Sequence, residues 1–457
     1  MLGENVTFAL AASALFLEGL ALLFAMFMRW RMWWAHLASQ KQPGAAALRV
    51  CFLHPDLGIG GAERLVVDAA VAAQTLGHDV TVFTAHHDSK RCLPETRDGT
   101  LRVAVVGGWL VPMSVRGRLV VACANARSVL GAIALMFRVP QLDVVVIDQV
   151  SASVPLFRLC GVPVLFYCHF PDKLLVRRSS SSFVRCVRGL LRIPFDLLEE
   201  VSIAFASRTV VNSLFTAGVY HEAFPLLRNL HRLPACPPPG VLYPAVDTDA
   251  LQPLLRPPVE RGVCLLSINR FEAKKGHMLA LAALKELAET QPQLAARVRL
   301  VFAGGYDERL DENVSCLAEL RQAASPLGSS VEFWQNVSNE KREALFKECA
   351  AVVYTPSHEH FGIVPVEAMA AARPVIAVNN GGPCESVLHG STGWLCEPTP
   401  QAFAAAFAKV VEMCVADAAA LDQMGVSARA HVVERFSHRS FAMQLDRHLR
   451  SIARHHV

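Results

Sequence analysis

Two patterns of apolar and polar residues alternate along this chain. Short apolar runs indicate buried strands, and between them apolar residues recur at the three- and four-residue spacing of helices that cover a sheet. In the first half, we expect strands at 48–53, 79–84, 101–106, 143–147 and 162–167. This succession predicts an α/β fold with a parallel sheet between helices.

The pattern restarts after PPPGVLYPAVDTD, a run from Pro237 to Asp249 that is rich in proline and turn residues. We interpret this run as a hinge. Beyond it, strands are expected at 264–268, 298–303, 331–333, 351–354, 375–378 and 393–395, helices at 278–289 and 339–349, and further helices from Pro400. The simplest architecture is two doubly wound domains that face each other across a cleft.

The length of 457 residues also suggests two domains of about 200 residues each. We place an N-terminal anchor and linker at 1–43, a first Rossmann-like domain at 44–243 and a second at 244–436. A C-terminal helix at 437–457 is expected to pack back on the first domain.

The segment from Val6 to Met28 carries one charge, Glu18, and is long enough to cross a bilayer. A cleaved signal peptide is the alternative, but the segment lacks a basic start. Arg29 and Arg31 follow it, so the remaining chain is expected in the cytosol. The apolar stretch 119–137 is expected to form a buried or membrane-touching helix.

Composition narrows the classes of partner. The chain is 53% hydrophobic and 18% charged, and its formal charge of +4 is too small for a nucleic-acid footprint. The 13 cysteines include no C-x-x-C pair, which favours a reducing compartment over a disulfide framework or a zinc site.

The segment TPSHEHFGIVPVEAM, at 355–369, carries the strongest chemical signal. A strand ends just before it, and Pro365 suits the first turn of a following helix. Amides at a helix N-terminus favour a diphosphate, and glycine permits close approach. The expected amide donors are those of Phe361, Gly362, Ile363 and Val364.

Two glutamates flank this helix start. Glu367, expected in the first turn, can accept hydrogen bonds from ribose hydroxyls, and Glu359 at the loop start faces a sugar. The alternative is that Glu367 only complements the helix dipole and Glu359 is a solvated charge.

Cations follow a strand in the second half, in SINRFEAKKG. They lie at the carboxyl edge of a parallel sheet, where such folds bind ligands. We expect Arg270 and Lys275 to contact phosphate, and Lys274 to be a solvated turn residue.

In the first half, Gly58, Gly60 and Gly61 form a turn that opens a helix, whose amides could approach phosphates or a sugar across the cleft. The turn falls short of the dinucleotide-binding pattern. His169 follows a strand, where it could bond a sugar, although a lone histidine is more often structural.

A metal centre is not predicted. Asp247 and Asp249 have Asp-x-Asp spacing, but they lie in the proline-rich run and are interpreted as turn residues. His358 and His360 are too close for the H-E-x-x-H zinc pattern.

The E-x7-E pair, Arg270, Lys275, the GGAER turn and NSLFT resemble retaining glycosyltransferases of the GT-B fold, which have two facing Rossmann-like domains. More narrowly, the chain resembles the α-1,3/1,6-mannosyltransferases of asparagine-linked glycosylation. The motifs that carry this resemblance are HPDLGIGGAERLVVDAA, DQVSA, FYCHFPD, LSINRFEAKK, AGGYDER, YTPSHEHFGIVPVEAM and NNGGPCES.

The resemblance implies transfer of mannose from GDP-mannose to a dolichol-diphosphate-linked oligosaccharide, at the cytosolic face of the endoplasmic reticulum membrane. The second and third mannoses would be added with retained anomeric configuration, and no protein nucleophile is required. Carried over by motif, the sugar lies at Gly61, His169 and Glu359, the ribose at Glu367, and the diphosphate at Arg270 and Lys275. The second domain would bind the donor and the first the acceptor.

Two alternatives stay open: a retaining glycosyltransferase with another donor or acceptor, and a catalytically silent protein that binds a nucleotide sugar. The sequence also leaves open an association with other glycosyltransferases of the pathway.

Overall fold

The structure is a computed structural model and describes residues 33, 47–108, 110–115, 119–139, 141–175, 182–232, 236–251 and 262–454, with side chains of 182–191 left aside. The span expected at 6–28 lies outside these residues. The described chain divides into two compact units. The N-terminal unit draws on 1–210, 221–240 and 445–457, and the C-terminal unit on 211–220 and 241–444.

The sheet of the N-terminal unit has seven strands in the order β3-β2-β1-β4-β5-β6-β7. Its central strand β1 pairs in parallel with β2 on one side and β4 on the other, and β4 pairs in parallel with β5. The strands are β1 (Arg49–His54), β2 (Asp79–Thr84), β3 (Val103–Val105), β4 (Val144–Asp148), β5 (Val164–Cys168), β6 (Arg208–Val211) and β7 (Gly240–Val241).

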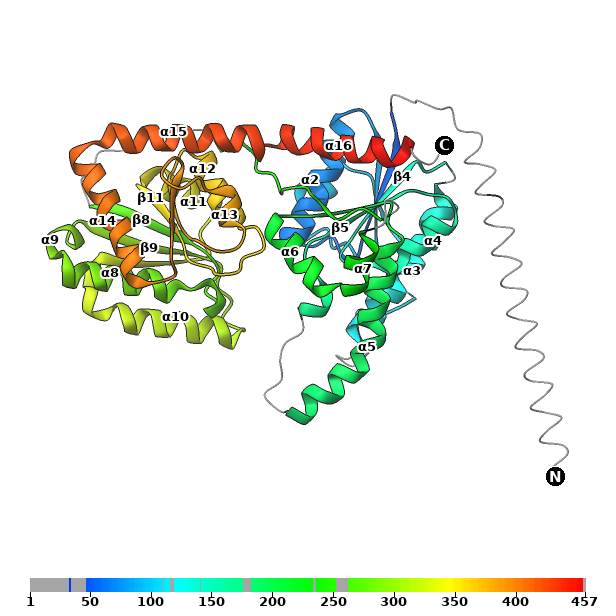
Figure 1. The fold of residues 1–457 in the computed structure, drawn as a ribbon, viewed down its shortest axis with the longest axis horizontal. Helices are drawn as coiled ribbons and strands as arrows, with labels where there is room; N and C mark the ends of the chain where they lie inside the picture. Colours follow the sequence, from blue (N-terminus) through cyan, green and yellow to red (C-terminus); the bar gives the residue numbers. More distant parts are fainter. Residues whose placement is uncertain are drawn as a thin grey trace. The chain divides into compact units, whose positions relative to one another are not determined.

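Helices surround this sheet (Figure 1). The α-helices are α2 (Gly61–Thr75), α3 (Val120–Arg138), α4 (Val154–Leu159), α5 (Ser182–Ala204) and α7 (Pro225–Leu230), and short 3-10 turns are η1 (Pro94–Thr96), η2 (Ser151–Ser153) and η3 (Asp172–Leu174). Helix α6 (Leu214–Ala223) follows β6, and its residues up to Tyr220 belong to the C-terminal unit. The long C-terminal stretch of the other unit begins at Val241, inside the proline-rich run, and the short segment 211–220 also belongs to that unit.

The sheet of the C-terminal unit has six strands in the order β10-β9-β8-β11-β12-β13, and all its neighbours are parallel. The strands are β8 (Val263–Ile268), β9 (Val298–Gly304), β10 (Val331–Gln335), β11 (Ala351–Tyr354), β12 (Val375–Val378) and β13 (Gly393–Cys396). In each sheet the strand order reverses beside the first strand, which is the doubly wound Rossmann arrangement. The prediction of two Rossmann-like domains is therefore confirmed.

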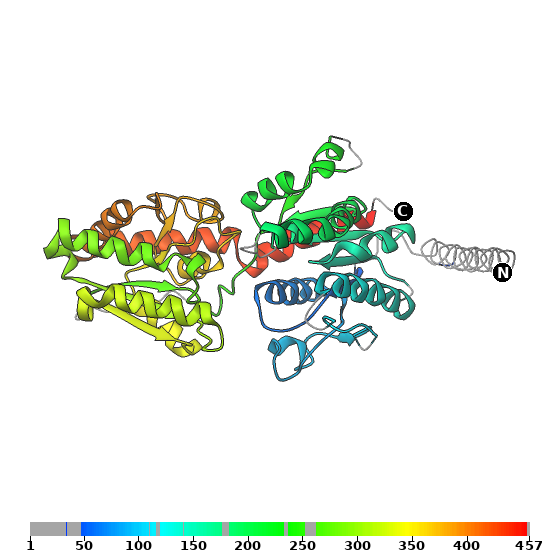
Figure 2. The ribbon, with the colours of Figure 1, turned by 90° about the horizontal axis from the view of Figure 1, so that it is seen from below.

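Helices lie on both faces of the six-stranded sheet (Figure 2), and an apolar core fills the space between the sheet and the helices on each face. One contains residues of α8, α10 and α14, and the other contains residues of α11, α12 and α15. The helices of this unit are α8 (His277–Thr290), α9 (Pro292–Ala295), α10 (Asp311–Ala324), α11 (Asn339–Glu348), α12 (Ile363–Ala370), α13 (Pro383–Ser386), α14 (Pro400–Ala416) and α15 (Ala418–Arg435), with η4 (Ala273–Lys275) and η5 (Ser325–Ser330).

The last helix, α16 (His438–Arg454), contributes its final residues to the N-terminal unit. There His78, whose side chain is buried, places its Nε2 atom 2.8 Å from Oδ1 of Asp446. The opposite ring nitrogen of His78 accepts the N–H of Leu48, the residue just before β1. His78 therefore links helix α16 to the segment that enters β1.

Helix α3 is the one described helix that is long and apolar enough to cross a membrane, a property that core helices of soluble proteins share. One side of α3 is buried through Cys123, Arg127, Gly131, Ala132, Leu135 and Met136. A Cβ atom at Gly131 would lie 3.1 Å from Cδ1 of Leu53, so the helix packs closely on β1. The expectation of a helix buried in the fold is confirmed for this side.

The strands expected from the sequence all occur, and each end is shifted by at most two residues. The short strands β6 and β7 were missed. β7 has only two residues and follows a row of prolines, so it carries no strand pattern of its own.

Candidate active site

The chemistry predicted for the second half gathers at the carboxyl ends of β8 and β11, which are neighbours at the point where the strand order reverses. Chain segments that leave these two strands meet directly. The hydroxyl of Thr355, just after β11, donates to the carbonyl of Lys275 at 2.9 Å. This edge is where doubly wound sheets bind ligands.

An ion pair joins the two segments. Nζ of Lys275 lies 2.6 Å from Oε2 of Glu359, and the two side chains are 14% and 25% exposed. Partial shielding from water strengthens such a pair relative to one on the open surface. The structure thus brings together a predicted phosphate ligand and the predicted sugar-facing carboxylate.

A second glycine turn fixes the loop that carries Glu359. Gly382 donates its N–H to the carbonyl of Glu359 at 2.9 Å, and Asn380 Oδ1 accepts the N–H of His358 at 3.1 Å. His358 has a φ of 56°, which is uncommon for a residue other than glycine. The NNGG motif therefore dictates the shape of the loop.

Helix α12 begins at Ile363, after an N-cap glycine, Gly362, with φ of 79°. A side chain at Gly362 would lie 3.1 Å from the ring of Tyr354, so glycine is required there for conformation and space. Pro365 is the third helical residue, as expected for the first turn. The amides of Ile363 and Val364 belong to this first turn and lack helical acceptors.

Glu367 was expected in the first turn of the helix, but it lies just past that turn. Because α12 starts at Ile363, Glu367 is its fifth residue and lies beyond the first turn. Its carboxylate pairs with the guanidinium of Arg342 on α11. The two side chains are 19% and 31% exposed, so Glu367 has a partner that orients it.

Tyr354, the last residue of β11, was missed by the sequence analysis. Burial raises the pKa of its phenol well above the ordinary value, and the charges of Glu359 and Glu367 raise it further. The phenol is therefore a neutral group that is close enough to both predicted carboxylates to feel their charge. Its only signal in the sequence is its place at a strand end that precedes the loop.

The other predicted phosphate ligand has a different partner. Nη1 of Arg270 lies 3.1 Å from Oε1 of Glu272, while Nζ of Lys274 lies 3.0 Å from Oε2 of the same residue. Arg270 is 65% exposed and Lys274 is 66% exposed. Arg270 and Lys275 thus have separate carboxylate partners in this structure, and Glu272 is a second residue that the sequence analysis missed.

The NSLFT motif packs on the same loop within the C-terminal unit. The hydroxyl of Ser213 donates to the carbonyl of His360. The N–H groups of Leu214 and Phe215, at the start of α6, both donate to the carboxylate of Glu385 at 2.7 Å. This motif therefore supports the loop between the two glutamates.

In the N-terminal unit, the predicted glycine turn opens α2 directly after β1. Helix α2 begins at Gly61, and Gly60 is its N-cap with extended backbone. The carboxylate of Glu63 occupies the space that a side chain at Gly60 would need. Gly58 and Gly61 face open space, which leaves their backbone accessible to a ligand.

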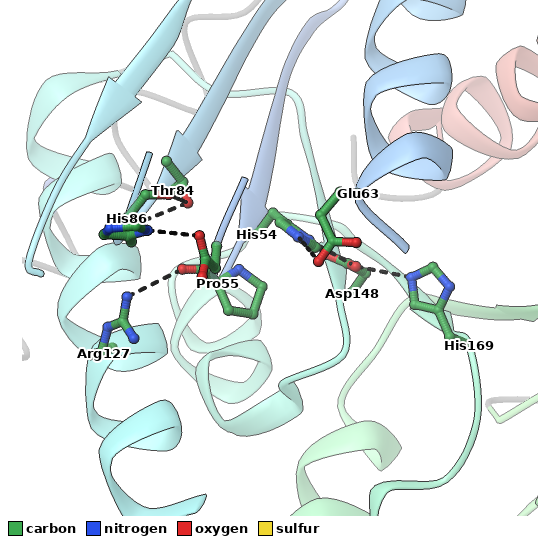
Figure 3. Close-up of polar contacts among 9 residues, drawn as sticks. His54, Pro55, Glu63, Thr84, His86, Arg127, Asp148 and His169 are labelled. Carbon is green, nitrogen blue, oxygen red and sulfur yellow. Dashed lines mark hydrogen bonds and ion pairs between the residues drawn. The ribbon is translucent and has the colours of Figure 1, made fainter. Parts of the chain in front are cut away.

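His169 lies one residue past β5, and its Nε2 atom is 2.9 Å from Oδ2 of Asp148 (Figure 3). Asp148 also receives Nδ1 of His54 at 2.8 Å. Burial raises the pKa of Asp148, but His54 and His169 outweigh burial and bring it down to about 2. Sequence reasoning found His169 but missed the buried Asp148 and His54.

Asp247 behaves as a turn residue, since its Oδ1 atom accepts the N–H groups of Asp249 and Ala250 at 3.0 and 2.8 Å. Within the described part of the chain, no group of three or more histidine, cysteine or acidic side chains has a geometry that could hold a metal ion. The twelve cysteines whose side chains are described are all free thiols.

Comparison with known proteins places the chain in a family. Residues 59–249 match "Glycosyltransferase Family 4" and residues 257–425 match "Glycosyl transferases group 1". The chain is 43% identical over 413 residues to the α-1,3/1,6-mannosyltransferase ALG2 of Homo sapiens, covering 88% of this chain and 95% of that protein. The chain belongs to the ALG2 family.

The ALG2 family extends far from animals. The relative from Dictyostelium discoideum is 41% identical over 425 residues, covering 87% of this chain and 97% of that protein. As a family member with two glycosyltransferase domains, the chain is a glycosyltransferase.

Solved structures share the fold of this ALG2-family chain at low identity. The catalytic domain of starch synthase IV from Arabidopsis thaliana, bound to ADP and acarbose, has a TM-score of 0.67 at 14% identity, with 89% of this chain and 99% of that chain covered. HepE from Anabaena, in complex with UDP and glucose, has a TM-score of 0.61 at 20% identity, with coverages of 88% and 100%. The shared fold is GT-B.

Proposed function

We propose that the chain transfers mannose from GDP-mannose to a dolichol-diphosphate-linked oligosaccharide, and adds the α-1,3- and α-1,6-linked mannoses of the N-glycan precursor. The observation that carries this proposal is 43% identity to human α-1,3/1,6-mannosyltransferase ALG2 over 88% of the chain. The arrangement around Glu359 supports a nucleotide-sugar donor, because cations and first-turn amides lie at one sheet edge with two carboxylates.

Each group has a role in this proposal. Arg270, Lys275 and the first-turn amides of α12 bind the diphosphate, and Glu367 accepts hydrogen bonds from the ribose hydroxyls. Glu359 and His169 contact the mannose. Lys275, at 14% exposure, holds its charge where attraction to a departing diphosphate is stronger than in bulk water.

In the proposed reaction, the bond from the mannose anomeric carbon to the donor phosphate breaks as a bond to the acceptor hydroxyl forms on the same face. The acceptor proton passes to an oxygen of the departing diphosphate. The configuration is retained without a covalent sugar–enzyme intermediate, unlike in retaining glycosidases.

We also propose that transfer needs no divalent metal, because cationic side chains and helix amides take the role of charge neutralisation. Addition of EDTA is then expected to leave turnover unchanged. Turnover that is abolished by EDTA and restored by Mg²⁺ would show that a metal takes part.

The proposed location is the endoplasmic reticulum membrane, with both units in the cytosol. Proteolysis of sealed microsomes that contain the full chain tests this orientation. Digestion of the C-terminal unit without detergent is expected, whereas its protection would reverse the assignment.

The decisive experiment measures the purified full chain in detergent with GDP-mannose, UDP-glucose and UDP-N-acetylglucosamine, on a lipid-diphosphate-linked oligosaccharide that carries one mannose. We expect two mannoses to be added from GDP-mannose alone, with products cleaved by α-1,3- and α-1,6-specific mannosidases. Transfer from a UDP-sugar instead would assign another donor, and donor binding without transfer would identify a silent binding protein.

A further inference from the structure

A buried carboxylate at the reversal point of the N-terminal sheet joins two histidines. Asp148 ends β4 and is 2% exposed, and it lies beside His54, which ends β1 (Figure 3). Nδ1 of His54 is 2.8 and 2.9 Å from the two oxygens of Asp148, and Nε2 of His169 is 2.9 Å from Oδ2. A charge this deep is tolerated only because it is paired and hydrogen-bonded.

These contacts determine which ring nitrogens carry hydrogen. An ionised carboxylate only accepts hydrogen bonds, so Nδ1 of His54 and Nε2 of His169 must both be donors. A neutral His169 then has its lone pair on Nδ1. Nδ1 of His169, the ring nitrogen that is not bonded to Asp148, is therefore able to accept a hydrogen bond from a hydroxyl group.

The exposure of the three side chains separates their roles. His169 is 19% exposed, whereas Asp148 and His54 are 2% and 1% exposed. Only His169 can reach a ligand, so any influence of the other two must pass through it. Oε1 of Glu63, in the first turn of α2, is 4.0 Å from Nε2 of His54. His54 therefore lies between two carboxylates, those of Asp148 and Glu63.

The two carboxylates beside His54 favour its protonated form. Burial lowers the pKa of His54, but Asp148 and Glu63 raise it by more, so the net pKa lies above its ordinary value. Nε2 of His54 makes no hydrogen bond within the described chain. Charge on His54 is thus stabilised by two carboxylates, and a charged His54 in turn keeps Asp148 ionised.

We propose that Asp148 is a positioning residue for sugar transfer: held by His54, it fixes the ring of His169 so that Nδ1 accepts a hydrogen bond from a hydroxyl of the transferred sugar. This inference rests on the proposed function for the identity of the sugar. It adds that the acceptor atom is Nδ1, and that two buried residues determine it.

The first test needs no substrate. The full chain, labelled with ¹⁵N in its histidine rings, is examined by long-range ¹H–¹⁵N NMR at pH 8, and the signals of His169 are assigned by their loss in His169→Gln. A protonated Nε2 and a bare Nδ1 are expected. A proton on Nδ1, alone or together with Nε2, would overturn the inference.

The second test is a double-mutant cycle of Asp148→Ala and His169→Ala. Asp148→Ala is expected to lower kcat about tenfold or more with little change in KM for the donor. In the His169→Ala background, the same change should alter kcat less than about twofold, because its effect passes through His169. Full additivity of the two losses would indicate a merely structural carboxylate.

The matched control is Asp143→Ala, which removes another carboxylate beside β4. Asp143 accepts the N–H of Arg49 at 2.7 Å, so its loss tests the general effect of an emptied acceptor near the same strand. Its kcat is expected to stay within about twofold of the parent. Asp148→Asn, which keeps the volume, replaces Asp148→Ala in the cycle if the alanine variant does not fold.

The two proposals fail in different ways. If another nucleotide sugar is the donor, the cycle is measured with that donor and the assignment of mannose alone is lost. If GDP-mannose is used but His169 carries its proton on Nδ1, the proposed function stands and the positioning role is lost.

Discussion

Nζ of Lys275 lies 2.6 Å from Oε2 of Glu359, although the two residues are 84 positions apart in the chain. The contact joins the segment after β8 to the segment after β11, at the edge where the sheet order reverses. It assigns Lys275, rather than its neighbour Lys274, to the site, since Lys274 pairs with Glu272 and is 66% exposed. Adjacent lysines thus have different surroundings.

We predict that Lys275→Met lowers kcat about 100-fold or more, because a preorganised charge beside the departing diphosphate is lost. Lys274→Met is the matched control and should retain kcat within about threefold. Initial rates with GDP-mannose and the lipid-linked acceptor measure both, and thermal melts confirm folding. Equal losses in the two variants would refute the assignment.

Glu367 and Arg342 are predicted to act as a pair in donor binding. Glu367→Gln should raise KM for GDP-mannose about tenfold, because a charged hydrogen-bond acceptor for the ribose is replaced by a neutral one. Arg342→Gln should raise KM in the same direction by releasing the Glu367 side chain. If Glu367 instead only stabilises the fold, both variants will lower the melting temperature and leave KM unchanged.

Most strands could be predicted because they are largely apolar and buried, as in β4 and β5, where every residue is buried. Pairings between distant polar residues could not, because no local pattern reports them. His54 and Asp148 are 94 positions apart and meet only because β1 and β4 are neighbours in the sheet.

In the sequence, glycine and proline positions predicted the location of the site better than the positions of charged residues did. The glycine turn at Gly58, Gly60 and Gly61 and the position of Pro365 each specify a local backbone, so the helix starts beside them followed from the sequence. Glu367 was placed in the first turn but lies just past it, because Pro365 occupies the third helical position and the sequence does not fix at which residue before Pro365 the helix begins. The partners Arg342 and Tyr354 had no signal beyond their strand and helix positions.

Glu199 on α5 is predicted to make stability depend on pH. Its carboxylate accepts the N–H groups of Asp172 and Lys173 at 2.7 and 3.2 Å, and burial raises its pKa from 4.5 to about 7. Because the folded state holds this proton more tightly than the unfolded state, the contribution to stability is full below about pH 4.5 and is lost as pH rises through 7.

Melting temperatures between pH 5 and pH 8 test this prediction, because this range brackets the raised pKa of Glu199. Glu199→Gln keeps an oxygen that accepts N–H groups and cannot ionise. The parent should lose stability relative to this variant as pH rises, and the difference should level off above pH 8. A difference that does not change with pH would show that Glu199 does not titrate in this range.

Two glycines with left-handed backbone give the sharpest test of the loop that carries Glu359. Gly381 has φ of 68°, and a Cβ atom there would lie 2.6 Å from the carbonyl oxygen of Glu359. Gly390 has φ of 79° and no atom within 4 Å of the same position. Alanine at either site costs about 1–2 kcal/mol of backbone strain, but only alanine at Gly381 must displace the loop.

We therefore predict a lower melting temperature for Gly381→Ala than for Gly390→Ala, because only the former adds a clash with backbone atoms. We also expect kcat to fall about 100-fold or more in the first and to stay within about twofold of the parent in the second. Small displacements of positioned groups have large effects on rate because transfer requires aligned reacting atoms. Activity that falls equally in both variants would mean that general strain, not the position of Glu359, limits the reaction. Activity retained in both would remove Glu359 from the reacting centre.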